Sequence, residues 1–296
     1  MKISHTTHSP YDRDDQADTK SLSIIIPVYN EETGIAACLD AIAAQTVAPD
    51  EVIVVDNNST DRTLEIARRY GFVRIIHERR QGVYFAHNTG MDSAKGDILA
   101  RIDADTLVGP GWAAAIVGAF ADGSVQAASG SVGYHDMPFV EFGRYVQDGC
   151  LRVARAGGYR FLWATNMAIT RRAWRLVRRE LCHQSFLFED NDIALHLRQH
   201  GIQPAYLRDM RVDISARRLA DRPRDFRRYI AGHSRTWRHH GKRLAPGVRF
   251  VEVAFTLTYI GLKPLHMSYD AELRRLSLAK ILRTNQTRPN PMGLEP

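Results

Sequence analysis

The stretch Asp97-Ile-Leu-Ala-Arg-Ile-Asp103 is a short, mainly apolar run that leads into an acidic pair, Asp103 and Asp105. A run of this length between polar residues is typical of a buried strand. Three similar runs precede it, and segments with helical spacing of apolar residues lie between the runs. The expected strand regions are residues 21–30, 51–56, 73–77 and 97–103, and the expected helices are residues 34–46, 62–70 and 83–94. This alternation predicts an α/β fold with a mostly parallel central sheet and helices on both faces.

Polar side chains stand at the ends of three of these expected strands. They lie at residues 29–31, 56–58 and 103–105. Ligands of open parallel sheets bind at the carboxyl ends of the strands. We therefore expect the three polar strand ends to form one shared site.

The acidic pair Asp103 and Asp105 is suited to a divalent cation. Residues i and i+2 of an extended segment point the same way, so both carboxylates can reach one ion. Oxygen ligands of this kind favour Mg²⁺ or Mn²⁺. Motifs of several other kinds of site are missing from the sequence. The chain has no GxGxxG dinucleotide-binding motif after the first strand, no phosphate loop ending in GK[ST], no HExxH metalloprotease motif and no GxSxG hydrolase motif.

Composition places the chain among globular proteins. It has 296 residues, a net charge of +7 and three widely spaced cysteines, which argue against a disulfide scaffold and fit a reducing compartment. We expect a flexible polar tail at residues 1–20, an α/β domain at 21–205, and a basic, mainly helical and partly apolar extension at 206–296. Without an apolar run long enough to span a membrane, the expected location is cytoplasmic.

Three linked motifs resemble the family 2 glycosyltransferases. They are Ser23-Ile-Ile-Ile-Pro-Val-Tyr-Asn-Glu-Glu32, Val52-Ile-Val-Val-Asp-Asn-Asn-Ser-Thr-Asp61 and Gly96-Asp-Ile-Leu-Ala-Arg-Ile-Asp-Ala-Asp105. The resemblance extends in order over about residues 21–201 and implies an inverting enzyme with the Rossmann-like GT-A fold. It also implies that the domain at 21–205 binds a nucleotide sugar and is catalytic. The last third of the chain resembles no family.

The resemblance implies a role for each matching residue of the first half. Pro27, Tyr29 and Glu31 match the loop that lies against the nucleoside, and Asp56 matches the acid that accepts a hydrogen bond from the base. Asp103 matches a residue that contacts the ribose and the metal, and Asp105 matches the direct metal ligand.

The segment Gly82-Val-Tyr-Phe-Ala-His-Asn88 resembles a Gly-x-x-x-Ala-Arg-Asn element of the family. Asn88 therefore joins the expected donor contacts. His87 stands where the family commonly has arginine, and Arg80 is the candidate for the missing cation.

Two later motifs complete the resemblance. The run Ala164-Thr-Asn-Met-Ala-Ile-Thr-Arg-Arg-Ala173, which contains Asn166, resembles the loop and strand under the donor sugar. Glu189 and Asp190 resemble the acidic ED motif, which implies that Glu189 contacts the donor and Asp190 is the general base. Acidic enrichment at the start of a helix over residues 191–200 is the alternative interpretation.

A third metal ligand is sought among the histidines of the extension. His233 is preferred over His239 and His240 because it lies in the short Ala-Gly-His-Ser element. Exposed histidines on a basic helix are the alternative for each of them.

The expected function is transfer of a sugar from a nucleotide-diphosphate sugar, with UDP as the commonest carrier, to a carbohydrate or lipid-linked acceptor of cell-surface glycans or glycolipids. One base and one Mn²⁺ or Mg²⁺ ion imply inversion by single displacement, because a retaining hydrolase uses two flanking carboxylates. The alternatives are a sugar nucleotidyltransferase and a non-catalytic basic module that binds nucleic acid. No nucleic acid partner is expected under the preferred reading.

The extension also raises the question of a membrane surface. Residues 211–243 are rich in arginine, and residues 250–262 form an apolar run. A peripheral contact with an anionic inner membrane face is one interpretation. In the other interpretation, the arginines pair with the chain's own acidic residues. The apolar run is then a core strand or helix, which Pro264 breaks.

Overall fold

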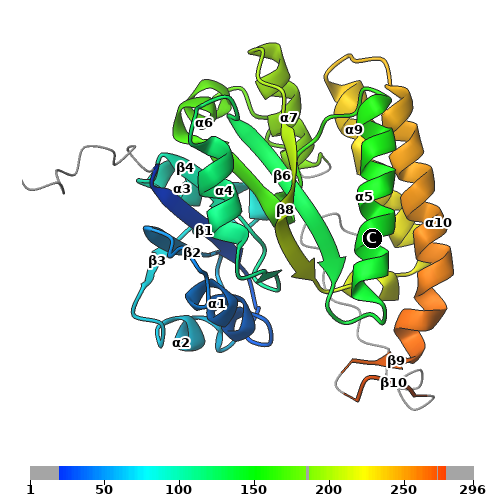
Figure 1. Cartoon of the computed structure of the whole chain (residues 1–296), viewed down its shortest axis with the longest axis horizontal. Helices are drawn as coiled ribbons and strands as arrows, with labels where there is room; N and C mark the ends of the chain where they lie inside the picture. The colour runs from blue at the N-terminus through cyan, green and yellow to red at the C-terminus, as the bar shows by residue number, and fades with distance from the viewer. Residues whose placement is uncertain (1–19, 185–186, 272, 278–296) are drawn as a thin grey trace, which may run out of the picture.

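The computed structural model describes residues 20–184, 187–271 and 273–277 and contains an eight-stranded sheet (Figure 1). The strands lie in the order β3-β2-β1-β4-β7-β6-β8-β5. Their bounds are β1 Leu22–Val28, β2 Glu51–Asp56, β3 Val73–His77, β4 Ile98–Arg101, β5 Leu107–Val108, β6 Ala127–Tyr134, β7 Met167–Thr170 and β8 Ala205–Ile214. Strands β1 to β4 are parallel, as is the pair β6–β8, whereas β7 is antiparallel to both neighbours and β5 to β8. The predicted mostly parallel sheet is confirmed.

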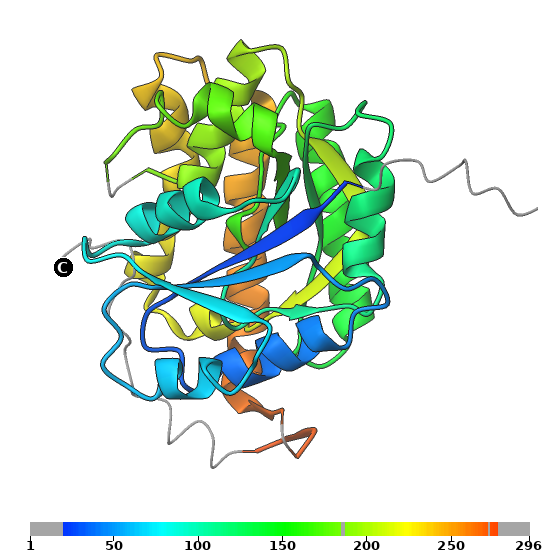
Figure 2. The ribbon, with the colours of Figure 1, turned by 90° about the vertical axis from the view of Figure 1, so that its left-hand side faces the viewer.

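Helices cover both faces of the sheet. Helices α1 (Ile35–Ala43), α2 (Thr63–Ala67) and α4 (Trp112–Phe120) pack on one face, and α3 (Val83–Ser93), α6 (Arg171–Val177) and α7 (Glu189–Gln199) pack on the other. Figure 2 shows α1 and α2 on the side of β1–β3 opposite α3. Alternate residues of β1 enter the two cores, since Ile24 and Ile26 belong to one and Ile25 to the other. The continuous apolar strands of the sequence therefore follow from burial on both faces.

Most expected elements of the first half are present. Strands β2 and β3 have the predicted bounds, whereas α2 is shorter than the expected 62–70. Helix α7 begins at Glu189, two residues earlier than expected, and Gly201 after it has a φ of +77°. A left-handed residue just beyond a helix favours glycine, as predicted.

A second helical layer contains α5 (Val140–Ala156), α8 (Pro223–Ile230), α9 (Gly232–His239) and α10 (Pro246–Ser268). Helix α10 runs along α5 (Figure 1), and the N–H of Gly247 donates to the carbonyl of Gly157 at 3.0 Å. Two short 3₁₀ segments, η1 (Ala164–Asn166) and η2 (Arg217–Ala220), and a small hairpin, β9 (Tyr269–Asp270) with β10 (Arg275–Leu276), complete the described elements. The predicted helical extension is therefore present.

The apolar run at residues 250–262 is part of helix α10, one of the two forms expected for it. The expected break at Pro264 is wrong, because α10 continues through Pro264 to Ser268. The carbonyl that loses its partner belongs to Ile260, and both Ile260 and Pro264 are exposed, so water can reach this part of the helix. Among the described residues, no helix is long and apolar enough to cross a membrane.

The predicted domain boundary falls inside the sheet. Strand β8 begins at Ala205 and ends at Ile214, so the predicted boundary after residue 205 cuts off the first residue of this strand and assigns the rest of it to the extension. It pairs with β6 over most of its length. Of the predicted polar tail, all residues except Lys20 lie outside the described part of the chain.

Candidate functional site

The carboxyl ends of β1 and β4 bring three acidic residues together with one arginine. The guanidinium of Arg217 lies 3.2 Å from a carboxylate oxygen of Glu31 and 3.2 Å from one of Asp105. Asp103 is close enough to raise the pKa of Asp105 by repulsion. Of the three polar strand ends that were expected to form one site, those at residues 29–31 and 103–105 meet here, and their role as a binding site stays a prediction.

The carboxylate of Asp105 is mostly buried beside two other acids and one arginine. Burial raises the pKa of Asp105 to about 6, and repulsion from Asp103 and Glu31 adds to the rise, while Arg217 opposes it. Arg217 is a cation held between carboxylates, which is the environment that a divalent ion occupies. Hard oxygen donors of this kind fit Mg²⁺ or Mn²⁺.

The residues predicted to meet the nucleoside lie at the ends of β1 and β2. Asp56 is 5% exposed, accepts a hydrogen bond from the N–H of Ser59 at 3.0 Å and lies 3.2 Å from His77 Nδ1. Tyr29 is exposed, so its ring is accessible for stacking. Pro27 is half-buried in β1, next to the β2 strand. Their contact with a nucleoside remains a prediction.

Arg80 is engaged by a neighbouring acid, whereas Asn88 has a free acceptor atom among the described residues. Arg80 forms two hydrogen bonds with Glu78, at 3.0 and 2.9 Å, and lies over the ring of Phe85. The Arg80 pairing lowers the pKa of Glu78 to about 2. Asn88 on α3 is half-buried, and among the described residues its Oδ1 has no hydrogen-bond partner. Arg80 is engaged with Glu78 through two of its nitrogen atoms, whereas Asn88 Oδ1 is available for a donor contact.

Arg101 is a site residue that the sequence reading missed. It is 2% exposed, forms an ion pair with Glu189 and lies 3.2 Å from Asp103. Its guanidinium thus links the end of β4 to the start of α7. The signal was present in the sequence, because Arg101 interrupts an otherwise apolar strand and a buried arginine needs an acidic partner.

Several buried polar atoms around Arg101 have no hydrogen-bond partner among the described residues. They are both ring nitrogens of His87, Nε of Arg101 and Oε2 of Glu189. Burial, with a contribution from Arg101, lowers the pKa of His87 well below its usual value, so its ring is neutral. The positive charge beside Glu189 is therefore that of Arg101. His87 Nδ1 lies 3.8 Å from Glu189 Oε2, beyond hydrogen-bond distance, and buried polar groups without a hydrogen-bond partner mark a place where water or a ligand can bind.

Asp190 is held by main-chain N–H groups at the start of α7. One carboxylate oxygen accepts from the N–H of Ala164 at 3.0 Å, and the other accepts from its neighbour Asn191 at 2.7 Å. Burial raises the pKa of Asp190 in spite of these bonds and of Arg101. Burial also raises the pKa of Glu189 to about 7 against the attraction of Arg101.

Asn166 lies inside the sheet. It is fully buried, donates to the carbonyls of Ser131 at 3.1 Å and Met210 at 2.8 Å, and accepts from Trp112 Nε1 at 2.9 Å. A direct contact with a donor sugar would require the surrounding strands to move. The structure therefore gives this side chain a supporting role in the sheet.

His233 packs against α7 and not against the acidic group. Its Nδ1 is 2.6 Å from Tyr159 Oη and 3.0 Å from Asn191 Nδ2. Burial lowers the pKa of His233 to about 3. In the described part of the chain, no hydrogen bond or ion pair joins His233 to Asp103 or Asp105. The cation beside Asp105 is instead Arg217, which the sequence reading did not select because 112 residues separate it from that aspartate.

Comparison with known proteins agrees with this geometry. Glycosyltransferase AglE of Haloferax volcanii is 39% identical over 118 residues, which are 38% of this chain and 39% of that protein. A PGL/p-HBAD biosynthesis glycosyltransferase of Mycobacterium bovis is 33% identical over 171 residues, which are 56% of this chain and 58% of that protein. The matched part of the chain thus spans less than two thirds of either relative.

The fold is also shared with a solved structure. Mannosyltransferase PcManGT from Pyrobaculum calidifontis, in complex with GDP-Man and Mn²⁺, has a TM-score of 0.59 at 21% identity, covering 93% of this chain and 81% of that one. The glycosyl transferase family 2 model matches residues 23–186, more than half of the sequence. The chain therefore belongs to glycosyl transferase family 2, as its strand-end motifs predicted.

Proposed function

We propose that the protein transfers a sugar from a nucleotide-diphosphate sugar to an acceptor hydroxyl with inversion at the anomeric carbon. The observation that carries the proposal is the linkage of two acidic groups through Arg101. This buried guanidinium contacts Asp103 on the metal side and Glu189, next to Asp190, on the other side. The candidate metal ligands and the candidate base therefore face one region at the edge of the sheet.

Asp105 and Asp103 would hold Mn²⁺ or Mg²⁺, with Glu31 adding negative charge nearby. When bound there, the ion neutralises the charge that develops on the leaving diphosphate. Arg217 must withdraw from Asp105 for the ion to bind. After withdrawal, its guanidinium is suited to a diphosphate oxygen, because arginine pairs with phosphate in the same geometry as with carboxylate.

Asp190 is the proposed general base. The N–H groups of Ala164 and Asn191 fix the orientation of its carboxylate. Burial raises its pKa, which makes the carboxylate a better proton acceptor than an exposed aspartate. It would take the proton of the acceptor hydroxyl as the new glycosidic bond forms and the bond to the diphosphate breaks.

The donor nucleoside would lie between Tyr29 and Asp56, with Pro27 beneath it. Asp56 accepts from a base N–H, which both uracil and guanine offer. Because PcManGT was solved with GDP-Man, a guanine nucleotide is as pertinent a test as the UDP-sugar that the sequence suggested.

The proposed process is the synthesis of cell-surface glycans or glycolipids on the cytoplasmic side of a membrane. The M. bovis relative is named for PGL/p-HBAD biosynthesis. Two helices of this chain support a membrane contact. Val253, Leu257 and Ile260 form an exposed apolar stripe on α10, and Phe142 and Val146 form another on the neighbouring α5.

Incubation with a panel of UDP- and GDP-sugars and Mn²⁺ tests the proposal. We expect slow release of the nucleoside diphosphate from one donor class, and none after chelation of the metal. A nucleotidyltransferase would instead form pyrophosphate from a nucleoside triphosphate and a sugar 1-phosphate. A non-catalytic module would bind nucleic acid and hydrolyse no donor, and either result would contradict the proposal.

A further inference from the structure

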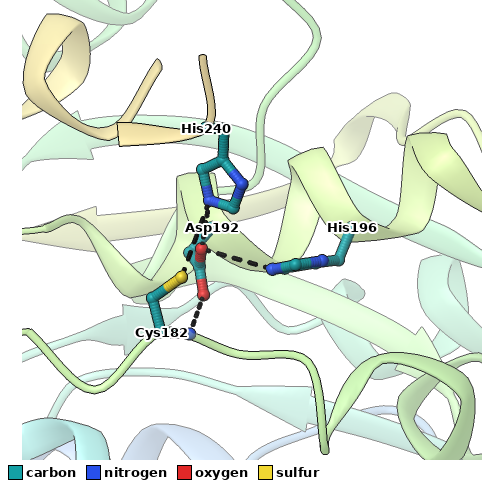
Figure 3. A group of neighbouring side chains, drawn as sticks. All are labelled: Cys182, Asp192, His196 and His240. Atoms are coloured by element: carbon teal, nitrogen blue, oxygen red, sulfur yellow. Dashed lines mark hydrogen bonds and ion pairs between the residues drawn. The ribbon is translucent and has the colours of Figure 1, made fainter. Parts of the chain in front are cut away.

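Four side chains with metal-binding chemistry meet beside α7 (Figure 3). Cys182 lies in the loop after α6, Asp192 and His196 lie one turn apart on α7, and His240 directly follows α9. One ligand atom of each residue lies within 4.8 Å of those of the others. None of the four belongs to the acidic group at the end of β4.

The separations approach those of a tetrahedral site. With metal–ligand bonds of about 2.0–2.3 Å, neighbouring ligand atoms stand roughly 3.3–3.8 Å apart. Cys182 Sγ is 3.9 Å from His240 Nε2, and Asp192 Oδ1 is 3.6 Å from His196 Nε2. His240 Nε2 and Asp192 Oδ1 are closer, at 2.6 Å, because a hydrogen bond joins them, and a metal ion would replace this bond.

His196 is already oriented as a metal ligand. It is 7% exposed, and neither ring nitrogen makes a hydrogen bond within the described ranges. Its Nδ1 lies 3.2 Å from Glu180 Oε2, while Nε2 faces Asp192. A histidine ligand commonly directs its second nitrogen to a carboxylate in this way, which leaves the first lone pair for the metal.

We infer that Cys182, Asp192, His196 and His240 form a Zn²⁺ site. Thiolate and imidazole ligands select zinc over Mg²⁺ or Mn²⁺. Asp192 is 1% exposed and the side chain of His240 8%, so four protein ligands close the site and its role is structural. Binding forms the zinc–sulfur bond and releases the Cys182 thiol proton to solvent.

The site would tie three separate segments together near the proposed base. Asp192 follows Asp190 by two residues, and His240 directly follows helix α9 of the extension. Zinc would therefore fix the first turn of α7 between the loop after α6 and the end of α9. This inference does not depend on the donor or the acceptor.

Metal analysis and cobalt spectroscopy of the full chain test the inference. After purification with Zn²⁺ and gel filtration, we expect about one equivalent of zinc per chain. Replacement of zinc by Co²⁺ should give a thiolate-to-cobalt charge-transfer band. Cys182→Ser should abolish the band, and Glu180→Gln should weaken Co²⁺ affinity about 10- to 100-fold.

Two matched variants keep the result specific. Cys150→Ser removes a cysteine outside the cluster and should keep the band, and Asp105→Asn should keep the zinc. A wild-type chain that shows no thiolate-to-cobalt band would overturn the inference without any variant, so it stays testable even if Cys182→Ser fails to fold. A band that survives Cys182→Ser, or that disappears in Cys150→Ser, would overturn it too.

Discussion

The carboxylate of Asp105 offers a direct test of the metal assignment. Asp105→Asn and Asp103→Asn each remove a ligand charge while they keep the shape of the side chain. We expect Mn²⁺-dependent turnover to fall about 100-fold, which corresponds to about 3 kcal/mol of transition-state stabilisation. The readout is donor hydrolysis at limiting Mn²⁺.

The fold should survive both changes, because each side chain is partly exposed. Circular dichroism and thermal melts serve as the control. Unchanged turnover of Asp105→Asn at limiting Mn²⁺ would remove Asp105 from the metal site.

Asp190 is tested by separating donor binding from transfer. In Asp190→Asn one amide oxygen replaces the two carboxylate oxygens, so one of the two main-chain hydrogen bonds is lost and the side chain cannot take up a proton. Loss of a general base typically costs about 10²–10⁴-fold in rate. We expect donor affinity, measured by calorimetry, to stay within a few-fold of wild type while transfer falls by that factor. A parallel collapse of donor affinity would instead mark Asp190 as a binding or structural residue.

Helices and strands could be predicted from the sequence where neighbouring residues carry the pattern. Strand β2 could be predicted because its consecutive apolar residues report burial on both faces. The edge strand β3 is only half-buried and carries a shorter apolar run. The convergence of Glu31, Asp103 and Asp105 followed from the rule that parallel strands end at one edge. No comparable rule predicts how the helices of the second layer pack. No sequence pattern near Pro264 showed that α10 would continue through this residue.

The partners of the site residues were harder to predict than their positions. The Arg217 contacts with Glu31 and Asp105 join segments far apart in the chain, and no periodicity reports such pairs. Arg80 was selected as the local cation, yet it is engaged with Glu78 two residues before it. Asn166 and His233 were selected for their motifs, and their hydrogen bonds became visible only in the packed structure.

Asp136 connects the end of β6 to the extension and carries a pH-dependent contribution to stability. It accepts from Ser215 Oγ and from the N–H of Ala216, both at 2.7 Å. Burial raises its pKa, but His266 and these two donors outweigh burial and lower the pKa to about 2. Because the folded pKa lies below the unfolded value of 3.8, this contribution is present above pH 4 and is lost as the pH falls towards 2.

We therefore expect Asp136→Asn to lower the free energy of unfolding at pH 7 by about 2 kcal/mol. The difference from wild type should shrink to roughly half at pH 3. Urea unfolding at the two pH values measures both quantities. An equal difference at pH 7 and pH 3 would show that shape, and not charge, determines the effect.

Seen as a whole, the molecule presents apolar and basic surface on neighbouring helices. On α10, Val253, Leu257 and Ile260 are each more than half exposed. Helix α8 packs against α10 through Phe226, whose ring stacks on Tyr259. The surface of α8 has an open cavity of about 470 Å³ lined by Pro223, Arg224, Arg227 and Arg228.

The two interpretations of the basic extension therefore apply to different arginines. Arg217 and Arg218 turn inward, to Glu31 and Asp105 and to Asp221 respectively, as the intramolecular account requires. The arginines around the α8 cavity lie on a helix that packs against α10, and α10 carries the exposed apolar stripe. We propose an anionic membrane surface as the partner, because the arginines would meet the headgroups and the apolar side chains would meet the lipid boundary.

We expect the protein to sediment with vesicles that contain anionic lipid at low salt, and to be released at high salt. Each arginine near such a surface contributes about 1 kcal/mol, and the attraction fades within a Debye length of about 10 Å at 0.1 M salt. Leu257→Asp should reduce binding because it places a charge in the stripe, whereas Leu176→Asp on α6 is the matched control and should bind as wild type. Both changes are at exposed sites, so thermal stability should be unaffected. Sedimentation that ignores lipid charge, or that Leu257→Asp leaves unchanged, would mean that the α10 stripe does not meet the membrane.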